Sequence, residues 1–243
     1  VLLSASPGGT PGPTVTPPEF NVRTRVQEYG GASYVVIGDS VVFSHYADQR
    51  LYRQRAGAAP AALTAPGYRW ADCVHDAARD RLICVREDHT PATVQAHGEE
   101  RNEIVAVPLA GAPTGEATGT VLVTGADFVA YPRVSPDGRR LAWLQWNHPD
   151  MPWDSATLHV ADLVADGVAN RVQVAGGARR AVLEPAWDAD GTLYFIDDPD
   201  GWWNLYRLRA GRVAAVAPMA REFGGRLWWP GARSYATTGD GRA

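Results

Sequence analysis

The sequence predicts an all-β fold, a partial β-propeller with four four-stranded blades plus the start of a fifth. The first observation is an apolar strand that follows a turn and recurs at 40–46, 81–85, 140–144 and 192–196. The second is a third strand that begins at residues 50, 103, 157 and 204, so that its copies lie 53, 54 and 47 residues apart. A period of about 40 to 50 residues built from short strands is typical of a propeller with one sheet per blade.

The blades can be placed in order along the chain. Residues 1–20 are rich in Pro, Gly, Ser and Thr and are expected to form an irregular linker or the end of a preceding blade. The propeller segment follows at 21–243, with blades at about 32–65, 69–125, 131–176 and 183–218 and an incomplete one at 227–243. Tight turns at Asp137-Gly138 and Asp190-Gly191 separate first from second strands, because Asp-Gly supplies the positive φ of a hairpin.

The predicted array is open at both ends. Each blade buries its faces only against its neighbours, so four blades and part of a fifth leave two faces uncovered. We therefore expect this chain to be a fragment of a longer protein; the alternative is a homo-oligomer in which a second copy covers the open faces.

The composition excludes several function classes. The chain has 243 residues, of which 45% are hydrophobic and 21% charged, and its net charge is −4. These values are ordinary for a soluble globular protein and predict neither a nucleic-acid partner nor a membrane partner. No apolar run approaches the length of about 18 residues that a membrane span requires. We expect a cytoplasmic protein.

The two cysteines, Cys73 and Cys84, lie on consecutive predicted strands of one blade. They face each other if the hairpin is centred between Ala78 and Arg79, and they could then form a disulfide. We favour the alternative of two reduced, buried thiols, because that state fits a cytoplasmic protein.

The long loops are expected on one face of the propeller. Strands alternate in direction within a blade, so second-to-third connections and blade-to-blade connections emerge on the same side. The loops at 87–101, 146–155 and 198–203 and the link at 125–128 are all of these kinds. Binding residues concentrate in loops held by a rigid scaffold, so this loop face is where we look for a site.

Several stretches resemble one family. They are Asn21–Gly31, Asp48–Arg53, Val85–His89, Ser135–Gly138, and above all His148-Pro-Asp-Met-Pro-Trp-Asp154 and Gly201-Trp-Trp-Asn-Leu-Tyr-Arg207. Together they resemble the N-terminal propeller of the prolyl oligopeptidase family of serine peptidases, in its acylaminoacyl-peptidase and dipeptidyl-aminopeptidase-like branch. Small departures occur at Gln27, where the family often has His, and at Ala32, which interrupts a glycine run.

The resemblance implies a separate α/β-hydrolase domain with a Ser-Asp-His triad. This chain contains no Gly-x-Ser-x-Gly motif and no residue that we assign to catalysis. We therefore expect a non-catalytic segment that caps the active site of a peptidase, restricts access to short peptides and meets its peptide substrate through the hydrolase domain. A stand-alone propeller that binds a protein or ligand is the alternative.

Candidate binding or domain-interface residues lie in three places. Glu28 and Tyr29 open the first blade, and the resemblance to dipeptidyl peptidases implies that Glu28 could bind a substrate ammonium group; the alternative is a structural turn. Arg86 and Glu87 end a strand on the loop face, where they could bind a substrate or form a local ion-pair network.

The third place is the 146–155 loop, which carries His148, Trp153 and Asp154. His148, Asp150 and Asp154 could suggest a metal, but they lack clear ligand spacing, and the prolines indicate a rigid packed loop. We expect no metal and no cofactor.

Overall fold

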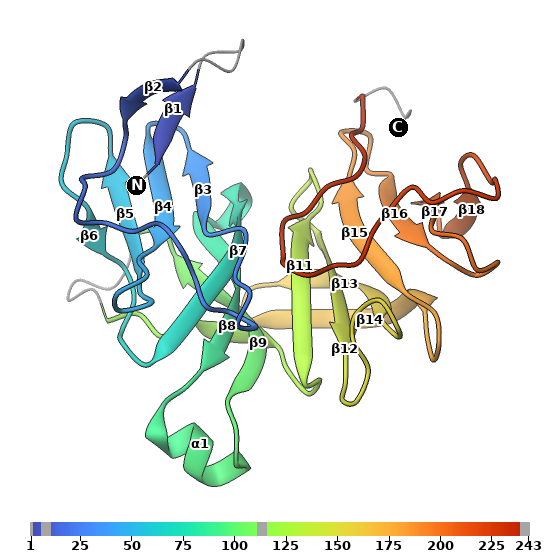
Figure 1. Cartoon of the computed structure of the whole chain (residues 1–243), viewed down its shortest axis with the longest axis horizontal. Coiled ribbons are helices and arrows are strands. Elements are labelled where there is room, and N and C mark those ends of the chain that lie inside the picture. Colours follow the sequence, from blue (N-terminus) through green and yellow to red (C-terminus); the bar gives the residue numbers. More distant parts are fainter. Residues whose placement is uncertain (1, 6–10, 111–115, 239–243) are drawn as a thin grey trace.

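The structure, a computed structural model, describes residues 2–5, 11–110 and 116–238. It contains four four-stranded antiparallel sheets and one two-stranded sheet, and the four larger sheets follow one another in an arc (Figure 1). In each of the four, the strands neighbour one another in sequence order. The prediction of an all-β partial propeller is confirmed.

The elements are short and regularly spaced. The first sheet contains β3 (Tyr34–Ile37), β4 (Ser40–Ser44), β5 (Leu51–Arg55) and β6 (Ala61–Ala62). The second contains β7 (Tyr68–Asp76), β8 (Arg81–Asp88), β9 (Arg101–Pro108) and β10 (Thr120–Val123). The third contains β11 (Phe128–Val134), β12 (Arg140–Trp146), β13 (Thr157–Val164) and β14 (Gly167–Gly176). The fourth contains β15 (Val182–Trp187), β16 (Leu193–Asp197), β17 (Asn204–Arg209) and β18 (Arg212–Ala215). The remaining pair, β1 (Leu3–Ala5) and β2 (Pro11–Thr14), forms a small sheet within the predicted linker.

The core lies between neighbouring sheets. Successive side chains of a strand point to opposite faces, so an apolar second strand can fill the space on both sides of its blade. Leu82 and Cys84 of β8 pack toward the first sheet with Trp70. Ile83 and Val85 of the same strand pack toward the third sheet. This two-sided burial explains why the second strands are the most apolar part of the repeat.

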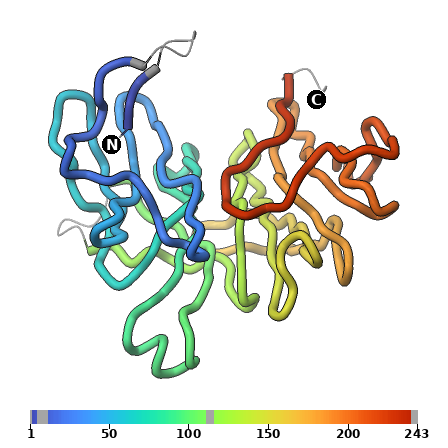
Figure 2. The backbone as a smooth tube through the Cα atoms, viewed as in Figure 1, coloured from blue at the N-terminus to red at the C-terminus, as the bar shows by residue number. Residues whose placement is uncertain are grey.

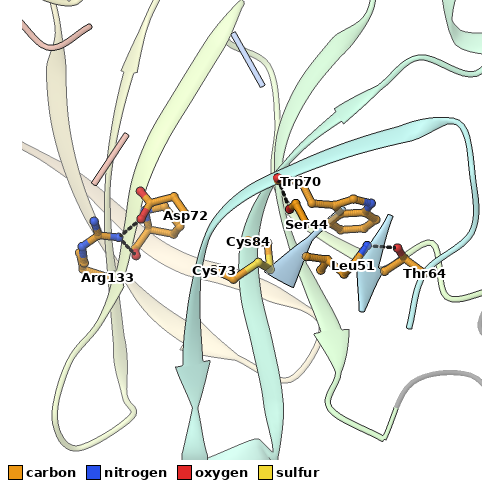
Figure 3. The surroundings of a disulfide bond; sticks show 9 residues. Ser44, Leu51, Thr64, Trp70, Asp72, Cys73, Cys84 and Arg133 are labelled. Atoms are coloured by element: carbon orange, nitrogen blue, oxygen red, sulfur yellow. Dashed lines mark hydrogen bonds and ion pairs between the residues drawn. A yellow bond between two sulfur atoms is a disulfide. The ribbon is translucent and has the colours of Figure 1, made fainter. Parts of the chain in front are cut away.

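The two cysteines form a disulfide (Figure 3), with a Cα–Cα distance of 4.0 Å. The register pairs Val74 with Ile83 and Asp76 with Arg81, so the hairpin is centred where the sequence suggested and Cys73 lies opposite Cys84. The expectation of reduced thiols is wrong for this structure. It rested on an assumed compartment, whereas the local geometry favours the bond, because facing positions of an antiparallel pair bring the two Cβ atoms within bridging distance.

A β-bulge recurs in β7, β11 and β15, the first strands of the second, third and fourth sheets, which are called the inner strands below. The register shifts between Ala71 and Val74 in β7, and the corresponding shifts occur in β11 and β15. At each bulge a non-glycine residue has a positive φ: 50° at Asp72, 51° at Tyr131 and 52° at Glu184. A bulge turns one side chain out of the pleat. Here it lets the Asp72 carboxylate accept hydrogen bonds from the Tyr131 amide at 3.0 Å and from Arg133 at 2.9 Å.

The segment at 227–238 forms no strand, although the sequence predicted the start of a fifth blade from 227. It instead crosses from the fourth sheet toward the first, in front of β11 and β15 (Figure 2, red). Ser234 donates hydrogen bonds to the Glu184 carboxylate through its amide at 2.6 Å and its hydroxyl at 2.9 Å. The Tyr131 hydroxyl donates to the Ala232 carbonyl at 2.9 Å. The bulges of the inner strands thus hold this terminal segment, 227–238, across the inner edge of the sheets.

Within the described residues, no helix has the length and apolar character that a membrane crossing requires.

Candidate functional site

The connection from β8 to β9 contains a short helix, α1 (Pro91–His97), which projects from the array (Figure 1). Thr90 caps it, and its hydroxyl accepts a hydrogen bond from the Thr93 amide at 3.4 Å. The Asp88 carboxylate accepts from the Thr90 amide and the Thr93 hydroxyl, each at 2.9 Å. Burial raises the pKa of Asp88, but these hydrogen bonds outweigh burial and lower it. The loop is therefore an ordered structure that fixes the ends of β8 and β9.

The last residues of β8 point alternately to two faces. Arg86 lies opposite Glu103 on β9 and binds it on the face toward the first sheet. Glu87 lies opposite Asn102 and points the other way, in line with Ile83 and Val85. Glu87 therefore emerges from the core between the second and third sheets, on the loop face.

Glu87 is buried, with 2% of its surface exposed, and is held by three neighbours. It accepts a hydrogen bond from the Gln27 backbone amide at 2.5 Å, and its other carboxylate oxygen lies 2.9 Å from His89 Nε2. Arg69 approaches it at 3.6 Å. A buried carboxylate needs such partners, because an unpaired charge out of water is costly. Glu87 therefore anchors the 21–31 segment against the end of β8.

Glu28 lies in the same segment but is exposed. Its carboxylate binds Arg69 at 2.6 Å and Arg25 at 3.5 Å, while two thirds of the side chain remains in solvent. The Arg69 hydrogen bond lowers the pKa of Glu28, with burial opposing it weakly and Arg25 adding to it. Glu28 is thus ionised and exposed, and each of its carboxylate oxygens is paired with an arginine.

These carboxylates border a cavity of about 220 Å³ on the loop face. Its lining contains four acidic residues, Glu28, Glu87, Glu100 and Asp150. Most of the remaining lining is apolar or aromatic: Tyr29, Phe128, Trp146, Pro149, Met151, Pro152, Trp153, Leu227 and Trp228. Trp228 packs between Tyr29 and Trp153, with ring centroids at 5.4 and 4.5 Å. Such an arrangement suits a ligand with a positive charge beside an apolar group.

The structure brings most of the predicted site residues together. Glu28, Tyr29, Glu87, His148 and Trp153 all line this cavity. They come from three separate segments of the chain.

Arg86 and Asp154 have other roles. Arg86 is buried, donates to Glu103 and to the Thr118 carbonyl, and lies over the Tyr68 ring at 4.7 Å. Asp154 accepts a hydrogen bond from the Met151 amide at 3.3 Å and so stabilises the turn in its own loop. Neither lines the cavity. Arg86 belongs to a local ion-pair network and Asp154 to a rigid packed loop, which are the structural alternatives given for them from the sequence.

Glu100 and Trp228 line the cavity but were not predicted to do so. Glu100 lies between α1 and β9. Only the pairing of β8 with β9 brings it near Glu87, and that pairing cannot be read from the residues around Glu100. Trp228 was expected to fill a fifth blade, and its aromatic character gave the only sequence signal that it could line a site.

No family model and no curated protein matches the chain. Among solved structures, a puromycin-hydrolysing peptidase of Mycobacterium tuberculosis is 41% identical, with a TM-score of 0.85 over 93% of this chain and 37% of that one. A puromycin hydrolase is 34% identical, with a TM-score of 0.81 over 94% of this chain and 37% of that one. The chain is a propeller segment of the prolyl oligopeptidase family.

The propeller segment spans only 37% of the length of these two relatives. A structure from a study of two prolyl endopeptidases is 14% identical with a TM-score of 0.57, and it supports the fold alone. The family resemblance that the sequence suggested is confirmed for the propeller part.

Proposed function

We propose that this propeller segment caps the active site of a serine peptidase, restricts access to short peptides and anchors the free amino group of the substrate. The observation that carries the proposal is the cavity on the loop face, whose lining combines the exposed Glu28 with aromatic side chains. A carboxylate and an ammonium group form a strong charge-assisted hydrogen bond in such a confined place. The chemistry would belong to a hydrolase domain outside this chain.

The relatives suggest a first substrate. Two of them are described as hydrolysing puromycin. Puromycin carries a free amino group close to an aromatic ring, so its cation suits the carboxylates of the lining and its ring suits the aromatic residues. We propose substrates of this class, with a free α-amino group next to a large apolar side chain.

The test uses the longer polypeptide that carries this propeller. Glu28→Gln removes the charge and keeps the shape of the side chain. We expect KM for a free-amino aminoacyl substrate to rise about tenfold, which corresponds to about 1.4 kcal/mol, and KM for the N-acetylated substrate to stay unchanged. Glu19→Gln is the matched control, because Glu19 is an exposed carboxylate outside the cavity. Equal effects on both substrates would overturn the anchoring role.

The isolated chain gives a second test. We expect no hydrolysis of aminoacyl or acyl-aminoacyl chromogenic substrates, and turnover that a serine-directed inhibitor does not abolish would contradict the proposal. An immunoblot of source cells separates the alternative: a band well above 26.2 kDa supports a peptidase segment, and a band at 26.2 kDa supports a stand-alone binding module.

Cytoplasmic location is also a proposal. Fractionation of source cells, with an immunoblot against this segment, tests it. Recovery of the segment outside the cytosolic fraction would overturn this location.

A further inference from the structure

Two cross-strand pairs on one face, at the end of the β8–β9 hairpin, carry four potential metal ligands. Glu87 lies opposite Asn102 in the register. His89 and Glu100 follow two residues further out, beyond the Asp88–Arg101 pair, where each flanks the strand end. Because side chains alternate between faces, residues two apart share a face, so these four side chains gather on the side toward the third sheet.

Three of these side chains already have ligand atoms close together. One atom each of Glu87, His89 and Glu100 lies within 4.8 Å of the others. The shortest contact joins His89 Nε2 to a Glu87 carboxylate oxygen at 2.9 Å. In the part of the chain that the structure describes, this is the only group of three or more His, Cys, Asp or Glu side chains with such spacing. It contains no residue of the 146–155 loop.

Asn102 supplies an independent observation. It is 5% exposed, and its Oδ1 atom has no hydrogen-bond partner among the described residues. Buried polar atoms are almost always satisfied, so an orphaned acceptor calls for a donor or a cation. Asn102 shares its face with Ile104 and Ala106, which pack toward the third sheet, and therefore with Glu87. The Asn102 side chain, which carries the orphaned oxygen, thus lies on the same face as the cluster.

We propose that Glu87, His89, Glu100 and Asn102 bind a divalent first-row metal ion. An imidazole nitrogen with carboxylate and amide oxygens suits Zn²⁺ better than Mg²⁺, which prefers oxygen ligands alone. The ion would take the place of the proton shared between Glu87 and His89 and would satisfy Asn102 Oδ1.

The surrounding charges permit a cation. Arg69 lies 3.6 Å from Glu87, but its guanidinium is also held by Glu28 at 2.6 Å. With Glu100, three carboxylates therefore accompany two guanidiniums, those of Arg69 and Arg25, at this end of the cavity. A divalent ion would reduce the net negative charge that remains.

This inference does not depend on the proposed function, because the binding of the ion is measured on this chain without any substrate. The chain, free of a histidine tag and stripped with a chelator, is titrated with Zn²⁺ in a calorimeter and then desalted for metal analysis by mass spectrometry. We expect one Zn²⁺ per chain and at least tenfold weaker binding of Mg²⁺.

Two conservative variants locate the site. His89→Gln and Asn102→Ala should each weaken Zn²⁺ binding tenfold or more. His97→Gln should leave it unchanged, because His97 is an exposed imidazole on α1 outside the cluster. Circular dichroism checks that each variant folds, and a variant that fails to fold is replaced by His89→Ala. A chain that retains no Zn²⁺, or equal affinity in His89→Gln and the native chain, would overturn the proposal.

Discussion

Reduction of the Cys73–Cys84 disulfide should lower the stability of the propeller segment by a predictable amount. The bond closes a loop with a sequence separation of 11. In the chain-entropy model, a crosslink of that length restricts the unfolded state by about 9 cal/mol/K, or about 2.8 kcal/mol at 25 °C. With a urea m-value of about 3 kcal/mol/M, the unfolding midpoint should fall by about 1 M.

The assay is urea unfolding of one protein preparation, followed by tryptophan fluorescence, with and without a phosphine reductant. The double variant Cys73→Ala/Cys84→Ala controls for any other effect of the reductant, and its midpoint should not respond. A native chain with the same midpoint in both conditions would refute the reasoning, provided that mass spectrometry shows the bond formed in one sample and absent in the other.

Three further predictions concern buried polar side chains. Burial, and then the charge of Arg171, lowers the pKa of His159 to about 4, so the folded state resists protonation that the unfolded state accepts near pH 6.5. The free energy of unfolding should be highest above pH 6.5 and fall by up to about 3 kcal/mol as the pH drops to 4. His159→Gln should remove that part of the pH dependence, which denaturation of both proteins at a series of pH values would check. Asp72→Asn leaves the charge of Arg133 unpaired in the inner edge and should cost about 3 kcal/mol in the same assay; a loss below about 0.5 kcal/mol would contradict the structural role. Glu184→Gln should weaken the hold on Ser234 and speed hydrogen exchange at 231–238, while exchange in β8 stays the same; unchanged exchange at 231–238 would count against that anchor.

Much of the fold follows from local patterns. Apolar second strands and Asp-Gly turns are encoded in short stretches, so the sheets could be placed from the sequence. The sequence placed Cys73 opposite Cys84 only for a hairpin centred between Ala78 and Arg79, and the register of β7 with β8 meets that condition. Their oxidation state did not follow from the sequence, because spacing carries no information about redox conditions.

The site was harder to predict, because it depends on contacts between distant segments. Glu28 and Trp153 were chosen from a resemblance, and the fold brings them to one cavity. Glu100 joins them only through the register of β8 with β9 and the length of α1. The terminal segment was predicted as a strand because it is rich in aromatic residues. Trp228 instead packs on Tyr29 and Trp153, and Tyr235 donates a hydrogen bond at the Glu184 bulge. No local pattern reveals these distant partners.

The terminal segment has a consequence for how the array unfolds. In an open row of repeats each blade is coupled only to its neighbours, so the two ends can unravel independently. Here Trp228 packs on Tyr29, which precedes the first sheet, while Ser234 binds Glu184 in the fourth. A side chain on Gly31 would collide with the Pro230 carbonyl at 2.5 Å, so the two segments are in direct contact. One stretch of chain therefore links the first blade to the last, and loss of either end releases the other, which makes the unfolding of an open row cooperative.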